Sequence, residues 1–157
     1  MKATTTMSLI VAALMISGYQ AHAAQGIGRA TMKVVTAIAV TNVSDLIFTE
    51  AAAGAAGETV MPDNVETAQN ASFTVTGEPN RAVNVTLPAD GSVKMMLGAG
   101  GSADTEIPVN QFTSSTLTQI DASGTSSLYV GATRADLTAT QTSGDYEGNF
   151  IVDVVYQ

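Results

Sequence analysis

The chain has 157 residues, with 14 acidic against 6 basic side chains and a formal net charge of −8. Such a surface repels phosphate backbones, so nucleic acid is a disfavoured partner. The sequence contains no cysteine and no tryptophan. It therefore has no thiolate for a disulfide, a cysteine nucleophile or a thiolate zinc site.

The beginning of the chain has the three parts of a secretory signal peptide. A basic second residue precedes an apolar stretch from Met7 to Ile16, and Ala21 and Ala23 occupy the two small positions that signal peptidase reads. The apolar stretch is too short for a bilayer span, which needs about 20 residues. We expect cleavage after Ala23, so residues 1–23 are lost. Residues 24–157 then form a single exported domain in the periplasm, at the cell surface or outside the cell, with no stable membrane insertion.

Alternating apolar side chains follow the cleavage site within a few residues. One face, interrupted only at Thr36, carries Ala30, Met32, Val34, Ile38 and Val40. This period of two predicts a β-strand. Two interpretations stay open. The segment is either one long first strand of the protein's own sheet, or residues 24–35 are a donor strand that pairs into the sheet of a neighbouring subunit.

The middle of the chain repeats the same period in shorter runs. Apolar and polar side chains alternate over residues 72–76, 83–87, 93–97 and 128–130. Turn residues separate the runs: Pro88–Gly91 predicts a short hairpin, and Asp121–Gly124 joins another pair of strands. Residues 51–57 and 98–103 are expected to be surface loops. Because no helical stretch is present, we expect an all-β fold, an antiparallel two-sheet immunoglobulin-like sandwich of about eight or nine strands.

The C-terminal segment, residues 144–157, has the most regular pattern. Its apolar face carries Tyr146, Phe150, Val152, Val154 and Tyr156. The opposite face is mostly polar, with Glu147, Asn149, Asp153 and Gln157, and has Ile151 and Val155 as apolar exceptions. We expect this segment to be the last strand of the sandwich.

This terminus, written G-x-Y-x-x-x-Φ-x-V-x-V-x-Y, resembles the last strand of chaperone–usher pilins, particularly the archaic, spore-coat-U-like class. The chain is also similar to a family of exported bacterial domains of unknown function, number 4402, through Asp45–Phe48 (D-L-x-F), Phe73–Pro79 (F-x-V-x-G-x-P) and the same terminus. The resemblance covers most of the mature chain. It implies a pilin-like sandwich whose partners are further copies of itself or a periplasmic chaperone and usher. A disulfide is usual in the spore-coat-U pattern, and this chain has no cysteine to form one.

The residues needed for common catalytic sites are missing from the mature chain. Its only histidine, His22, leaves with the signal peptide, which removes serine–histidine pairs and imidazole zinc sites. Carboxylates are densest at Asp63, Asp104–Glu106 and Asp145–Glu147, and none of these places matches a calcium-binding loop. We expect no enzymatic activity, no metal and no cofactor.

We therefore expect a non-catalytic structural subunit or adhesion-type module of a cell-surface appendage in a Gram-negative envelope, assembling by donor-strand exchange. The expected assembly residues are Ala30, Met32 and Val34 on the donor, and Tyr146, Phe150, Val152, Val154 and Tyr156 on the last strand. The alternative is a monomeric secreted sandwich that binds a glycan or a protein through its loops, with Phe112, Tyr129 and Tyr146 as aromatic contacts.

Overall fold

The computed structural model describes residues 25–157. The chain divides into two units, Met1–Lys33 and Val34–Gln157. Within the first unit, residues 25–33 carry neither helix nor strand. The second unit contains eight strands: β1 (Ala39–Ser44), β2 (Glu58–Thr59), β3 (Ala71–Thr76), β4 (Val83–Thr86), β5 (Val93–Met96), β6 (Glu106–Ser114), β7 (Thr125–Arg134) and β8 (Asp153–Tyr156). In the described residues there is no helix with the length and apolar character that a bilayer crossing requires.

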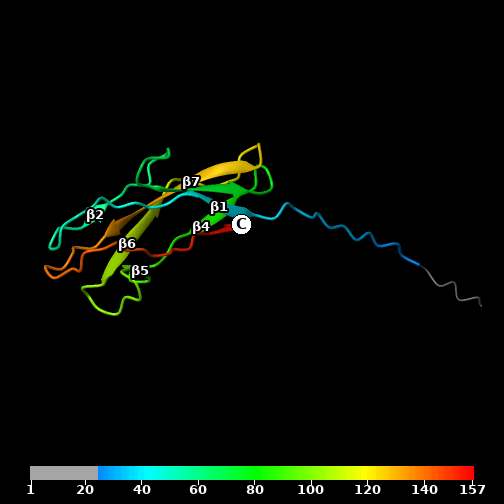
Figure 1. Cartoon of the computed structure of the whole chain (residues 1–157). Helices are drawn as coiled ribbons and strands as arrows, with labels where there is room; N and C mark the ends of the chain where they lie inside the picture. Colours follow the sequence, from blue (N-terminus) through cyan, green and yellow to red (C-terminus); the bar gives the residue numbers. More distant parts are fainter. Residues whose placement is uncertain (1–24) are drawn as a thin grey trace, which may run out of the picture. The chain divides into compact units, whose positions relative to one another are not determined.

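The strands form two antiparallel sheets (Figure 1). The larger sheet has the order β1-β3-β7-β6-β5, and the short strand β2 also pairs with β7. The second sheet pairs β4 with β8, the last strand of the chain. The protein is therefore an all-β, antiparallel two-sheet sandwich, as its alternating sequence predicts.

The core joins the two sheets. Its buried side chains come from β3 and β7 of the larger sheet, from β4 and β8 of the second, and from one connecting segment: Ala71, Val75, Leu128, Val130, Val83, Val154 and Ile120. A smaller cluster of Val93, Val109 and Ala132 lies along β5, β6 and β7. Leu46, Phe112 and Phe150 pack against both clusters, so the two form one continuous apolar interior.

The prediction of a hairpin at Pro88–Gly91 was wrong. The strand before this turn, β4, pairs with β8, whereas the strand after it, β5, pairs with β6 in the other sheet. The turn crosses between sheets because its polar groups bind β6. The Asp90 carboxylate accepts a hydrogen bond from the Gln111 backbone amide at 2.6 Å. The Gly91 backbone amide donates to the Asn110 side-chain oxygen at 2.7 Å.

β6 is a nine-residue strand that the alternation did not reveal. Ile107 and Val109 are buried, but the next inward side chain is Phe112 rather than residue 111. The register shifts between Asn110 and Thr113, and Gln111 has a positive φ of 52°. This β-bulge inserts a residue and breaks the period of two, which hides the strand from a pattern search.

The first and last strands are shorter than predicted. β1 starts only at Ala39, because its partner β3 ends opposite it at Thr76. β8 starts only at Asp153, because β4 ends opposite it at Thr86. The interpretation of residues 30–40 as one long first strand is therefore wrong, since a strand continues only where a neighbour supplies hydrogen bonds.

Candidate functional site: the free edge of the C-terminal strand

Among the residues that the structure describes, β8 has a neighbouring strand on one edge only. The Gln157 amide donates to the Ala82 carbonyl at 3.1 Å. This hydrogen bond shows that the backbone groups of Gln157, and of every second residue before it, point toward β4. Because backbone groups alternate in direction along an antiparallel strand, those of Val154 and Tyr156 face away from β4. Among residues 25–157, no backbone hydrogen bond reaches this outer edge. The far side of β4 is covered at its start, where Ala82 bridges Gln119 and the Val83 amide donates to the Thr118 carbonyl at 2.9 Å. The last strand presents a free edge of the second sheet, and this edge can accept another strand.

Side chains along the C-terminal segment alternate between the interior and solvent. Val154 is buried, and Phe150, Val152 and Tyr156 are half-buried against the main core. The intervening side chains are exposed, including Ile151 at 74% and Val155 at 54%. The predicted faces of this segment are confirmed for residues 150–157. The free edge therefore borders the apolar interior directly.

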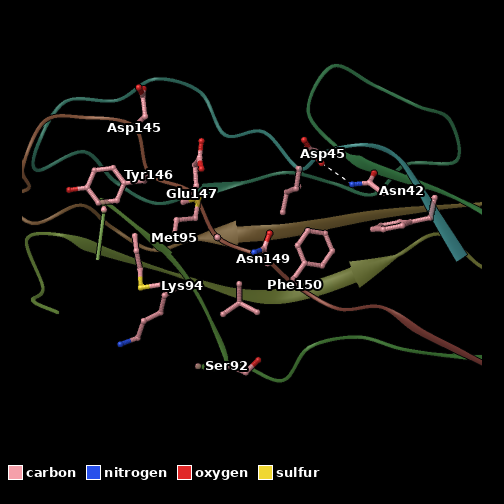
Figure 2. A pocket seen from close by; sticks show the side chains of 17 residues that line it. Asn42, Asp45, Ser92, Lys94, Met95, Asp145, Tyr146, Glu147, Asn149 and Phe150 are labelled. Atoms are coloured by element: carbon pink, nitrogen blue, oxygen red, sulfur yellow. Dashed lines mark hydrogen bonds between the residues drawn. The ribbon is translucent and has the colours of Figure 1, made fainter. Parts of the chain in front are cut away.

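A hollow of about 1160 Å³ adjoins the C-terminal segment (Figure 2). Residues 145–150 of that segment line it, together with β5 and the end of β1. Phe73 and Phe150 contribute aromatic lining and meet edge to face, with ring centroids 6.0 Å apart. At the β1 side the Asn42 amide donates to the Asp45 carboxylate at 2.8 Å. The hollow thus combines an apolar lining with polar groups.

The Tyr156 hydroxyl connects three segments at the end of β8. It donates to the Thr36 carbonyl and accepts from the Glu78 amide, both at 2.6 Å. The Glu78 carboxylate in turn accepts from the amide and the hydroxyl of Thr36, both at 3.2 Å. We call Thr36, Glu78 and Tyr156 the clasp. A Cβ on Gly77 would lie 2.5 Å from the Tyr156 oxygen, so a larger residue here would displace the hydroxyl from the clasp.

The family known as Domain of unknown function (DUF4402) matches residues 37–156. The chain belongs to this family. The matched residues include all eight strands of the structure, and the segment before Ala37 lies outside the match. No curated protein and no solved structure matches the chain significantly.

The three short motifs that this DUF4402 member shows have structural roles around the site. In D-L-x-F, Asp45 binds Asn42, and Leu46 packs against both core clusters. In F-x-V-x-G-x-P, Val75 is buried and Gly77 makes room for Tyr156. The first two motifs therefore both contact the region around the C-terminal segment.

Tyr146, a predicted assembly residue, is engaged within its own domain. Its hydroxyl lies 2.7 Å from the Thr142 carbonyl and 2.9 Å from the Asp104 carbonyl, and it accepts from the Gln141 side chain at 2.9 Å. Tyr146 therefore anchors the start of the C-terminal segment. Close by, the backbones of Glu147 and Met96 exchange two hydrogen bonds, at 2.7 and 3.1 Å, and these hold the segment against β5. The approach is so close that a Cβ on Gly148 would not fit beside the Lys94 carbonyl.

The predicted donor residues are not in any strand of the structure. Ala30 and Met32 belong to the first unit, and the Met32 side chain is exposed. Val34 begins the second unit and is also exposed. The predicted cleavage residues, Ala21 and Ala23, lie outside the described residues. Residues 25–35 therefore form no strand in the structure.

Two residues of the clasp were missed by sequence reasoning, although each left a signal. Thr36 is the one polar interruption of the apolar face of residues 30–40. Glu78 follows Gly77 inside the central motif. Each of these polar residues stands where the surrounding pattern would lead one to expect an apolar or turn residue. Only the fold shows that the two side chains contact each other.

Two acidic side chains have altered titration. Hydrogen bonds from the Thr140 and Thr138 hydroxyls lower the pKa of Asp104. The Lys94 ammonium, 2.6 Å away, and the Gly101 amide lower the pKa of Glu106. Within residues 25–157, no group of three or more acidic or histidine side chains could hold a metal ion. The partners found for these carboxylates stabilise loops.

Proposed function

We propose that this protein is a non-catalytic structural subunit or adhesion-type module of a bacterial cell-surface appendage, and that it assembles by donor-strand exchange. The observation that carries the proposal is the free outer edge of β8, which borders the apolar interior. An edge of this kind accepts an extended segment through main-chain hydrogen bonds, while alternate side chains enter pockets. The export that such a role requires is predicted by the signal peptide pattern.

The N-terminal segment supplies a matching donor. Residues 25–35 alternate in hydrophobicity, carry no strand in the structure and lie outside the DUF4402 match. The acceptor is the four-residue strand β8, preceded by the half-buried Phe150 and Val152. An extended segment of eleven residues is long enough to pair along all of this strand. Donor and acceptor therefore agree in pattern.

Deleting residues 24–34 from the exported chain tests this role. We expect the truncated domain to stay folded, because all of its strands remain, and to lose the ability to form oligomers. A synthetic peptide of residues 25–35 should then bind the truncated domain. Circular dichroism and light scattering measure folding and assembly, and isothermal calorimetry measures peptide binding.

Two peptide variants give a matched control. Met32→Asp places a charge on the face expected to enter the pockets and should abolish binding, because an unpaired carboxylate is costly to bury. Thr31→Asp introduces the same charge on the neighbouring, water-facing position and should leave most of the affinity. Equal effects of the two substitutions, or a truncated domain that binds neither peptide nor partner, would contradict donor-strand exchange.

The alternative function, loop-mediated binding of a glycan or protein by a monomer, is favoured by the hollow in Figure 2. Two of its expected aromatic contacts are already used, however. Phe112 packs against Phe150 with centroids 5.2 Å apart, and the Tyr146 hydroxyl is bonded internally. A mature protein that stays monomeric at every concentration, together with an unfolded truncation, would favour this alternative.

A further inference from the structure

The clasp fixes Thr36 just before β1 begins. Both backbone polar groups of Thr36 are bonded, the amide to the Glu78 carboxylate and the carbonyl to the Tyr156 hydroxyl. The Thr36 hydroxyl binds Glu78 as well. The chain therefore enters the larger sheet from a fixed point beside the C-terminal end of β8.

β1 and the C-terminal segment run in opposite directions along the hollow. Thr36, before β1, meets Tyr156, at the end of β8. Asp45, after β1, shares the hollow with Tyr146 and Phe150, which precede β8. For residues 25–33 to lie along the free edge of β8 in the same copy, the chain would have to reverse direction within residues 34–38.

The residues at this point are poorly suited to such a reversal. The sequence of residues 34–38 is Val-Val-Thr-Ala-Ile, with no glycine, proline, asparagine or aspartate. Tight hairpins need residues that accept a positive φ, and β-branched side chains resist it. The middle residue, Thr36, would also have to leave the clasp. If residues 25–33 paired with β8 of their own copy, the turn would be strained and the hydrogen bonds of Thr36 in the clasp would be lost. We call this pairing within one copy self-closure.

We propose that the strand completing the β8 edge comes from a second copy of this chain, and that the clasp together with the turn-poor residues 34–38 prevents a copy from completing itself. This inference rests on the proposed function and names its partner. The clasp directs assembly in one way, since each copy offers its own segment to the next copy and receives a segment from the previous one. Contacts of this head-to-tail type produce open filaments unless the ring closes.

Charge complementarity supports the pairing of two copies. Residues 25–35 carry Arg29 and Lys33 and no acidic residue. Residues 145–157 carry Asp145, Glu147 and Asp153 and no basic residue. These three carboxylates are on exposed side chains of the acceptor segment. Opposite charges on neighbouring strands favour pairing.

The test converts exchange between copies into self-closure. In the exported full-length protein, Val35→Asn together with Thr36→Gly removes the Thr36 hydroxyl from the clasp and introduces Asn-Gly, the strongest signal for a tight hairpin. We expect the oligomers of the unchanged protein to become monomers that no longer bind the peptide of residues 25–35. The matched control, Val35→Ala with Thr36→Ala, removes the same hydroxyl without supplying a turn and should remain oligomeric. Multi-angle light scattering over a range of concentrations measures the mass.

A second arm does not depend on the folding of these variants. The domain lacking residues 24–34 can accept a strand but cannot donate one, so adding it to the full-length protein should shorten the oligomers. Unshortened oligomers, or an Asn-Gly variant as oligomeric as the unchanged protein, would overturn the inference. A monomeric unchanged protein whose edge binds the peptide only after the deletion would also overturn it, because the segment would then close its own edge. A truncated domain that never binds the peptide instead overturns the proposed function itself.

Discussion

Truncation of two adjacent valines in β8 provides a quantitative test of the fold around the site. Val154 is 9% exposed and belongs to the main core, whereas Val155 is 54% exposed. Valine to alanine removes apolar groups worth about 0.8 kcal/mol for each buried carbon. For Val154→Ala this transfer loss is about 1.5 kcal/mol, and the cavity left in the core raises the total to about 2–3 kcal/mol. For Val155→Ala the loss is about 0.7 kcal/mol or less, because half of the side chain already contacts water.

Urea unfolding followed by far-ultraviolet circular dichroism measures both free energies of unfolding. The midpoint should fall much further for Val154→Ala, while the slope m stays constant in both variants. The difference between the two free energies should be about 2 kcal/mol. Equal losses, or a larger loss for Val155→Ala, would show that the inward and outward faces of the last strand are assigned wrongly.

Two further predictions concern the clasp and the acidic loops. Tyr156→Phe removes one hydroxyl with two hydrogen bonds and should cost about 2 kcal/mol in urea unfolding, because two backbone groups lose their partner. Tyr129→Phe, whose hydroxyl makes no hydrogen bond within the described residues, should cost almost nothing, and equal losses would argue against the clasp. Folding lowers the pKa values of Asp104 and Glu106 from the usual 3.8 and 4.5. The two ionised carboxylates therefore stabilise the folded state fully above these usual values. Their contribution disappears as the pH falls through the lower pKa values of the folded state. Asp104→Asn with Glu106→Gln should therefore reduce the loss of stability on acidification, and an unchanged pH profile of the unfolding midpoint would count against these contacts.

Several strands could be predicted because their evidence is local. At residues 83–87 the period of two identifies both the strand and its buried face. At residues 72–76 it identifies the strand and the buried Val75, but Ser72, predicted to face water, is buried as well. The same rule placed Phe150 and Val154 toward the core correctly. It failed at β6, because the bulge at Gln111 shifts the alternation by one residue.

The candidate site could be predicted only in part. The apolar face of the C-terminal segment is visible in the sequence, but the hydroxyl contacts that anchor Tyr146 and Tyr156 are not. Those contacts join polar atoms from distant loops, and no local pattern specifies which loop will supply the partner. The edge left free by the last strand is likewise a property of the sheet order, since it depends on which strands do not pair.

The sequence by itself determined the fold class and the buried face of most strands, because both depend on neighbouring residues one or two positions apart. Only the tertiary structure decided that the Pro88–Gly91 turn crosses between sheets and that β8 ends the second sheet. It also brought together the three residues of the clasp. Thr36 and Glu78 are 42 positions apart in the sequence, Glu78 and Tyr156 are 78 apart, and Thr36 and Tyr156 are 120 apart. Contacts at such separations follow from the packing of the whole chain, because each becomes possible only after the intervening strands have been placed.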